Sequence, residues 1–182
     1  MDDDALMRQV AAGDEGAFAA IVRAYQRPLT RFAERILVGD PQSAHDVVQE
    51  AFVLLWRMRA EYKPQSCLRS LLYRIVHNVS LDCARRAKLC TPLTMVTEHA
   101  ETLSEPLEAA CQSRALGEAI RQAVRTLPES QRVVFVLSQY EQLSYQQIAA
   151  ILGCPIGTVA SRKRLAVDVL RRKLRAWMDN EP

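Results

Sequence analysis

The chain has 182 residues, of which 49% are hydrophobic and 25% are charged, a balance ordinary for a soluble globular protein. Glycine is scarce and aromatic residues make up only 6%, so the composition favours helices over strands. The N-terminal stretch is acidic and has no apolar core, and no apolar run approaches the ~18 residues that cross a bilayer. These features argue against a signal peptide and against direct membrane insertion, and we expect a cytoplasmic protein.

The residues that usually carry catalysis or bind metals form no recognisable group. The five cysteines include no pair with CxxC spacing, and no cluster of histidine and cysteine resembles a zinc site, so we expect reduced thiols and no metal. The three histidines are scattered, and we find no Ser/His/Asp set, Gly-rich phosphate loop or carboxylate pair. The sequence therefore predicts no catalytic residues and no cofactor.

The net charge of +3 is too small to indicate nucleic-acid binding by itself, but its distribution along the chain is informative. Residues 57–88 carry a net charge of +6 and residues 114–182 a net charge of +5, whereas residues 1–56 and 89–113 each carry −4. Two basic blocks separated by an acidic joint predict two separate contacts with a polyanion.

Helical periodicity accounts for most of the first half of the chain. Pro28 lies inside the second predicted helix, where we expect a kink or a break. Ser43 and Ser66 are candidate N-caps of the third and fourth helices. The predicted helices are Asp4–Ala12, Glu15–Val38, Ser43 to about Arg59, and Ser66 to Lys88.

Residues 89–113 contain Pro92 and Pro106 and no basic residue, which is typical of a mobile linker. Helical periodicity resumes after it, with Gly153 expected as a left-handed residue that ends one of the helices. The predicted helices are Arg114–Arg125, Glu129–Tyr140, Ser144–Leu152, and one after Pro155 to about Trp177. We therefore expect an all-α protein of two small helical domains, 1–88 and 114–182, joined by a flexible linker.

The most specific local pattern is a short capped helix, a glycine turn and a basic helix between residues 143 and 175, which predicts a helix-turn-helix. We expect Ile148, Ala149 and Leu152 to face inward from the first helix. Side chains suited to reading duplex DNA share one face near the start of the second, namely Thr158, Ser161 and Arg162. Lys163 and Arg164 are candidate phosphate contacts. The alternative is a helical hairpin with a solvated basic face.

The helix predicted to end at Lys88 has an apolar stripe and a polar face that suits exposed bases and phosphates. That face comprises Arg69, Tyr73, Arg74, His77, Asn78 and Arg85. Its N-terminal end is rich in leucine, which favours single-stranded over duplex DNA as the ligand. The alternatives are a merely solvated face, a structural His77 and a Tyr73 half-buried in the core.

A small acidic and polar face is predicted on the third helix, where Asp46, Gln49 and Glu50 are spaced i, i+3, i+4. Taken alone, this face would be read as ordinary surface.

Together these motifs resemble one family. Residues 44–56, AHDVVQEAFVLLW, are similar to the "D-x-V-Q-E-x-F…W" segment of sigma factor domain two, and residues 72–86 to the "L-Y-R-I-x-x-N-x-x-x-D-x-x-R-R" helix after it. Residues 127–162 are similar to domain four. The resemblance covers nearly the whole chain outside 89–113. It includes neither domain three nor a long N-terminal extension, which implies the extracytoplasmic-function (ECF) group of RNA polymerase sigma factors.

The resemblance implies a role for each face and three partners: core RNA polymerase, promoter DNA and an anti-sigma factor that could hold the protein at the inner membrane face. Asp46, Gln49 and Glu50 would dock on the polymerase. The set implied for the single strand of the −10 element is Tyr62, Lys63, Arg69, Tyr73, Arg74, His77, Asn78, Arg85 and Arg86. The set implied for the −35 duplex is Ser144, Tyr145, Thr158, Ser161, Arg162, Lys163 and Arg164.

The chain departs from the family pattern in the recognition helix, where Ala160 and Leu165 stand at positions that are commonly basic. Leu71 stands where many relatives carry tryptophan. The competing function is a two-domain DNA-binding regulator that works without polymerase, in which the acidic face would be ordinary surface.

Overall fold

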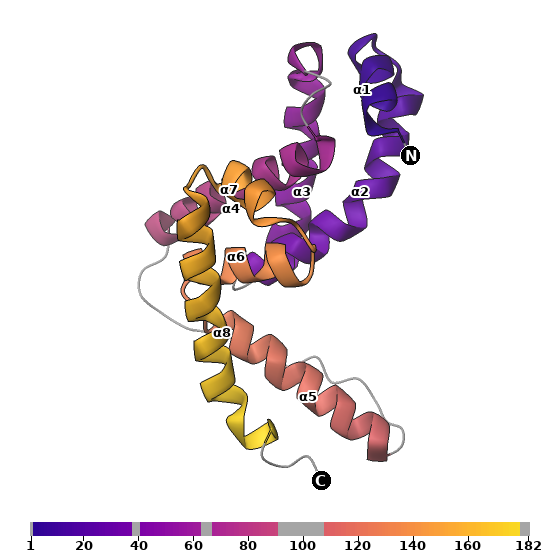
Figure 1. Cartoon of the computed structure of the whole chain (residues 1–182). Coiled ribbons are helices and arrows are strands. Elements are labelled where there is room, and N and C mark those ends of the chain that lie inside the picture. Colours follow the sequence, from indigo (N-terminus) through magenta and orange to yellow (C-terminus); the bar gives the residue numbers. More distant parts are fainter. Residues whose placement is uncertain (1, 38–40, 63–66, 91–107, 179–182) are drawn as a thin grey trace.

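The computed structural model describes residues 2–37, 41–62, 67–90 and 108–178, and every regular element in these ranges is a helix. The elements are α1 (Asp3–Ala11), α2 (Glu15–Ile36), α3 (Pro41–Arg57), the 3-10 turn η1 (Arg59–Glu61), α4 (Leu68–Cys90), α5 (Glu108–Arg125), α6 (Glu129–Gln139), α7 (Tyr145–Leu152) and α8 (Ile156–Met178). The expectation of an all-α chain is therefore confirmed (Figure 1).

The first two helices begin at aspartates that cap them. The Asp2 carboxylate accepts from the amides of Asp4 and Ala5, and the Asp14 carboxylate accepts from the amide of Ala17. Pro28 does not break α2, which is continuous from Glu15 to Ile36. Proline removes only one backbone hydrogen bond here, and burial of the neighbouring apolar side chains offsets that loss.

The start of α3 differs from the prediction. The helix begins at Pro41, so Ser43 lies in its first turn rather than at its N-cap. Proline suits the first helical position because the N–H that it lacks would have no partner within the helix. The predicted cap Ser66 and the site residue Lys63 lie outside the described residues.

Helices α1 to α4, the N-terminal unit, pack α2 against α1, α3 and α4. Helices α5 to α8 form the C-terminal unit, in which α8 packs against the other three. Helix α5 begins at Glu108, six residues before the expected start at Arg114, within the segment predicted as linker. Figure 1 shows α5 and the end of α8 extending away from the N-terminal unit, while α6 and α7 lie against it.

A buried arginine fixes the junction between α5 and α6. Arg132 is only 8% exposed, and its guanidinium donates to the carbonyls of Arg125 and Leu127 at 3.1 and 3.0 Å. Burial lowers the pKa of Arg132 from its ordinary value, with Glu129 opposing that change. Arg132 thus satisfies carbonyls that the end of α5 leaves without helical partners.

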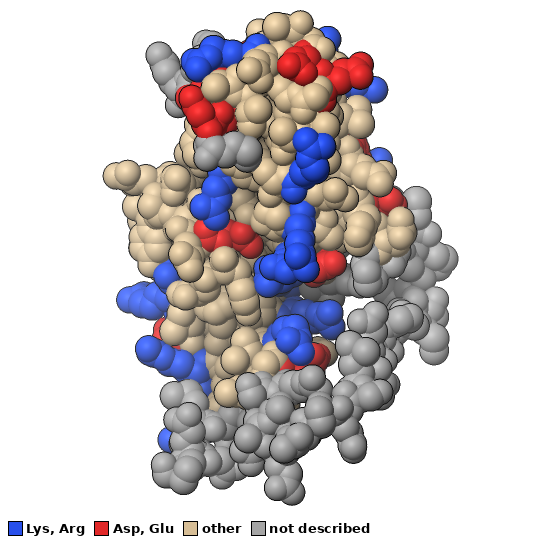
Figure 2. Space-filling model, turned by 90° about the vertical axis from the view of Figure 1, so that its right-hand side faces the viewer, with Lys and Arg blue, Asp and Glu red and all other residues tan. Residues whose placement is uncertain are grey.

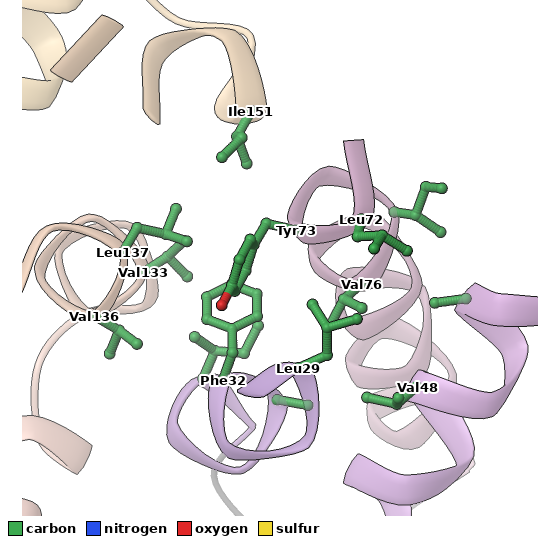
Figure 3. Packing of buried hydrophobic residues seen from close by; sticks show 14 of the residues in the cluster. Leu29, Phe32, Val48, Leu72, Tyr73, Val76, Val133, Val136, Leu137 and Ile151 are labelled. Carbon is green, nitrogen blue, oxygen red and sulfur yellow. The ribbon is translucent and has the colours of Figure 1, made fainter. Parts of the chain in front are cut away.

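The two units share one core. Helix α4 packs against α7, and α2 packs against α6. Figure 3 shows Tyr73 of α4 projecting between the units, among side chains from three other helices: Leu29, Phe32, Val133, Leu137 and Ile151. The ring centroids of Tyr73 and Phe32 lie 5.1 Å apart at 80°, the edge-to-face geometry that aromatic pairs favour. The units are therefore held in a closed arrangement.

Candidate polymerase and promoter interfaces

The helix-turn-helix formed by α7 and α8 has the predicted local geometry. The amide of Gln147 donates to the Ser144 hydroxyl at 3.2 Å, and the amide of Ser144 donates to the Gln147 side-chain oxygen at 2.9 Å. Gly153 follows α7 with φ of 61°, in the left-handed region. The capping box and the glycine C-cap are both confirmed.

The three predicted inward residues of α7 pack in or against the core, and Ile151 joins them. Ile148 and Ile151 are buried, while Ala149 and Leu152 are only half-buried. The prediction considered packing against α8 alone, but α7 also packs against α4, and Ile151 points toward Tyr73 of that helix (Figure 3). The contact between units thus selects a face that the local pattern does not reveal.

The start of α8 presents the predicted reading face. Ser161 is exposed, with its hydroxyl donating to the Thr158 carbonyl at 3.0 Å, and Thr158 and Arg162 are half-buried. Arg164 is exposed beside Leu165, which is 47% exposed. An apolar side chain of this size within a polar face can contact a thymine methyl group.

The side chains of Lys163 and Tyr145 lie against each other. The Lys163 ammonium lies 5.3 Å from the centroid of the exposed Tyr145 ring, within cation–π range. The pair joins the first turn of α7 to α8 and places a cation at the surface of the motif.

The predicted polar face of α4 divides into two. Because successive helical residues are about 100° apart, Arg74, Asn78 and Arg85 share one side of α4, and all three are exposed. Arg69, Tyr73 and His77 lie on another side, against the C-terminal unit: Tyr73 is 1% exposed and the other two are half-buried. The predicted exposure of Tyr73 is therefore wrong for the closed arrangement, and the core alternative describes it better.

Tyr73 and Arg69 converge on Glu141, in the turn between α6 and α7. The Tyr73 hydroxyl donates to the Glu141 carboxylate, and the Arg69 guanidinium donates to the Glu141 backbone carbonyl at 2.6 Å. Arg35 of α2 lies 3.5 Å from the same carboxylate and 4.2 Å from the Tyr140 ring centroid. Burial, and then the hydrogen bond to Glu141, raise the pKa of Tyr73 above its ordinary value.

His77 lines a cleft of about 440 Å³ between the units. Its other lining residues include Glu129 of α6 and Arg162 of α8, so the recognition helix contributes to this cleft. Burial lowers the pKa of His77, while the Glu129 carboxylate opposes that change. The Nδ1 atom of His77 is buried and has no hydrogen-bond partner among the described residues, which fits a neutral ring.

The acidic face of α3 is at the surface as predicted, with Asp46, Gln49 and Glu50 all exposed. Glu50 lies 3.8 Å from Arg86 of α4. It also lines a groove of about 600 Å³ between α3, η1 and α4, whose far wall includes Asn78 and Asp82. One residue of the acidic face, Glu50, and one of the exposed side of α4, Asn78, therefore line the same groove.

Tyr62 follows the 3-10 turn η1 directly and is half-buried. Its hydroxyl donates to the Asp4 carboxylate at 2.7 Å, and burial together with this bond raises its pKa. Tyr25 makes the corresponding bond to Asp3. Helix α1 thus holds the end of η1 in place.

Three residues have structural roles that the sequence did not predict: Arg35, Arg132 and Glu141. The partners of Arg35 and Glu141 lie far away in the sequence, so no local spacing indicates them. Arg132 bonds carbonyls five and seven residues before it, but no capping pattern marks that contact. Within the described residues, no group of three or more His, Cys, Asp or Glu side chains is placed to hold a metal ion. In the same ranges we find no helix with the length and apolar character needed to cross a membrane.

A four-helix unit that carries an acidic face and a basic helix, packed against a helix-turn-helix unit, defines a protein of the sigma factor class. Residues 21–89 match the family model "Sigma-70 region 2", and residues 117–169 match "Sigma-70, region 4".

The chain is 33% identical over 178 residues to the RNA polymerase sigma-H factor of Pseudomonas aeruginosa, covering 91% of this chain and 92% of that protein. It is 31% identical to the ECF RNA polymerase sigma factor SigW of Bacillus subtilis, covering 93% and 95%. Its fold is similar to that of CnrH, solved in complex with the cytosolic domain of CnrY, with a TM-score of 0.69, 25% identity and full coverage of both chains.

The chain therefore belongs to the sigma-70 family, in the ECF group of RNA polymerase sigma factors. Proteins of this family are transcription initiation factors that act with core RNA polymerase at promoters. Membership confirms the predicted class and decides against an enzyme and against a regulator that works without polymerase.

Proposed function

We propose that this sigma factor divides promoter recognition among three faces. Asp46, Gln49 and Glu50 dock on core polymerase. The exposed side of α4, with Arg74, Asn78 and Arg85, holds the single strand of the −10 element, and Arg69, Tyr73 and His77 join it when the units separate. The start of α8 reads the −35 element as duplex, with Ser144 and Tyr145 beside it.

The observation that carries this proposal is the groove shared by α3 and α4. Glu50 and Asn78 line opposite walls of the groove, so a polymerase element docked on the acidic face would lie beside the strand-holding face. The two faces carry opposite charge: α3 presents Asp46 and Glu50, whereas α4 presents Arg74 and Arg85. The groove itself carries charge of both signs, since Arg57 of α3 and Asp82 of α4 also line it, so the opposite charges of the two faces lie beside the groove rather than in it.

The docking role is tested by Asp46→Arg with Glu50→Arg in the full chain. We expect affinity for core polymerase to fall at least about tenfold, because two attractive contacts become repulsive. The matched control is Glu34→Arg with Glu118→Arg, which changes the net charge equally at exposed sites on α2 and α5. If both double variants bind core polymerase like the parent chain, the docking assignment is wrong.

Initiation itself is tested by adding the purified chain to core polymerase and a DNA library that carries random upstream sequences. We expect the chain to enrich one pair of promoter elements among the transcribed templates. Uniform transcription of the library would contradict promoter recognition.

An anti-sigma factor is the proposed protein partner. CnrH supports it, because that structural relative was solved with a cytosolic domain of another protein bound. Such a partner, if anchored, would hold this chain at the inner membrane face without any insertion of its own. Cell fractionation tests this: we expect part of the chain in the membrane fraction before induction and less afterwards, and an unchanging distribution would contradict anchoring.

A further inference from the structure

The Glu141 carboxylate is buried between the units, with only 7% of the residue exposed. A buried carboxylate is costly unless charged or hydrogen-bonding partners surround it. Among the described residues its side-chain partners come from the N-terminal unit: the Tyr73 hydroxyl on one oxygen and the Arg35 guanidinium 3.5 Å from the other. Arg69 adds a 2.6 Å bond to the backbone carbonyl of the same residue.

The backbone aims Glu141 into this position. The Glu141 amide bonds the Val136 carbonyl at 3.2 Å, and the Leu143 amide bonds the Leu137 carbonyl at 3.0 Å, so the turn is tied to α6 on both sides. Gln142 between them has φ of 53°, a conformation uncommon for a residue with a side chain. The turn is thus a fixed platform for one carboxylate.

On the N-terminal unit, two guanidinium groups and a phenol hydroxyl converge on Glu141: Arg35 and Tyr73 on its carboxylate, and Arg69 on its backbone carbonyl. This donor set suits a phosphodiester as well as a carboxylate, because arginine binds both and a tyrosine hydroxyl donates to both. Tyr73 and Arg69 belong to α4, the helix proposed above to hold the DNA strand. Arg35 extends the same donor set onto α2.

We propose that Arg35, Arg69 and Tyr73 form a phosphate-binding site for the non-template DNA strand, and that Glu141 occupies this site in the free protein. The inference rests on the proposed strand-holding role of α4. It adds an intramolecular competitor and a further binding residue, Arg35. Closure of the units and strand binding at this site then exclude each other.

The test uses Glu141→Gln in the full chain without polymerase. Glutamine keeps the shape of the side chain but removes its charge, so the attraction to Arg35 is lost. We expect X-ray scattering to show a larger radius of gyration, and fluorescence anisotropy to show roughly tenfold tighter binding of a labelled single-stranded oligonucleotide of mixed sequence. The matched control is Glu118→Gln, which removes the same charge from an exposed site on α5.

A second variant separates competition from general charge effects. Arg35→Gln in the Glu141→Gln background removes a proposed phosphate partner from an already opened chain, and we expect it to reverse most of the gain in affinity. Arg31→Gln, an exposed arginine on the same helix, serves as its control. Circular dichroism of each variant checks the helices, and Glu141→Ala, which removes the carboxylate and leaves all three proposed phosphate partners in place, replaces Glu141→Gln if that chain does not fold.

The proposal is overturned if Glu141→Gln binds the oligonucleotide no tighter than Glu118→Gln, or if Arg35→Gln and Arg31→Gln lower the gain equally. The proposed function fails by a different observation: the unaltered chain, mixed with core polymerase, would give no promoter-specific transcription.

Discussion

The two proposed DNA-binding helices differ in how much of their binding face the closed arrangement leaves accessible. Both helices have exposed and half-buried residues on their proposed binding faces, with Thr158 and Arg162 half-buried on α8 and Arg69 and His77 half-buried on α4. Only α4 has a proposed binding residue that is fully buried against the other unit, Tyr73. The space-filling view shows basic side chains spread over both units rather than gathered on one (Figure 2). Burial of part of one face, more than total charge, therefore distinguishes the two sites.

Among the variants that test this difference between the two helices, Tyr73→Ala is expected to have the largest effect. The change removes a buried ring packed on Phe32 and leaves the Glu141 carboxylate without its hydroxyl partner. We expect the free energy of unfolding to fall by about 3–5 kcal/mol in denaturant titrations. Arg74→Ala, at the next and exposed position, is expected to change it by at most about 0.5 kcal/mol. Similar values for the two would mean that α4 does not bury one face.

Arg162→Ala is expected to act on recognition at α8. Loss of a bidentate contact to a base should weaken binding of the preferred duplex by about 1–3 kcal/mol and relax the preference at one position. The measurement is selection of promoter sequences by the holoenzyme from a randomised pool. Arg171→Ala, later on the same helix, removes a candidate phosphate contact and should weaken binding to all DNA sequences alike. An unchanged sequence preference in Arg162→Ala would contradict the assignment.

Arg74→Ala with Asn78→Ala tests the exposed side of α4. Each lost hydrogen bond is worth about 1 kcal/mol, so the two changes together should slow promoter opening about thirtyfold. The variant should also lose retention of a template mismatched across the melted region, which needs no opening. Normal opening, or a defect confined to upstream duplex binding, would show that this side does not hold the strand.

The smallest expected effect is a dependence of stability on pH at the cleft between the units. His77 faces Glu129 and Arg162 there, and burial lowers its pKa in the native chain. The unfolded chain, with an ordinary value of about 6.5, then binds more protons than the native chain as the pH falls through that value. The contribution of His77 to the free energy of unfolding should therefore be fully present above about pH 6.5 and decline below it. The decline levels off once His77 is also protonated in the native chain.

The pH effect is measured as the free energy of unfolding in denaturant at several pH values. His77→Gln should remove this component while leaving the acid loss caused by carboxylates. A decline of the same size in His77→Gln would assign it to other groups.

The features predicted correctly from the sequence are those fixed by neighbouring residues. The capping box at Ser144 and Gln147 and the left-handed Gly153 depend only on the local chain. Periodicity also predicted which helices exist, although the start of α3 was misplaced because Pro41 serves as a first helical residue and Ser43 does not cap. The division of the α4 face could not be predicted, because Tyr73 is buried by residues on α2, α6 and α7 (Figure 3).

Glu141 and its arginine partners belong to the same chain, and this determines how strongly Glu141 competes with a DNA strand. A tethered group meets its site at an effective concentration on the order of millimolar, whatever the amount of protein. A DNA strand free in solution rarely reaches that level, but a strand melted within a polymerase complex is itself held beside the site. Access to the site formed by Arg35, Arg69 and Tyr73 should therefore depend on assembly with polymerase at a promoter, rather than on the concentration of free DNA strands.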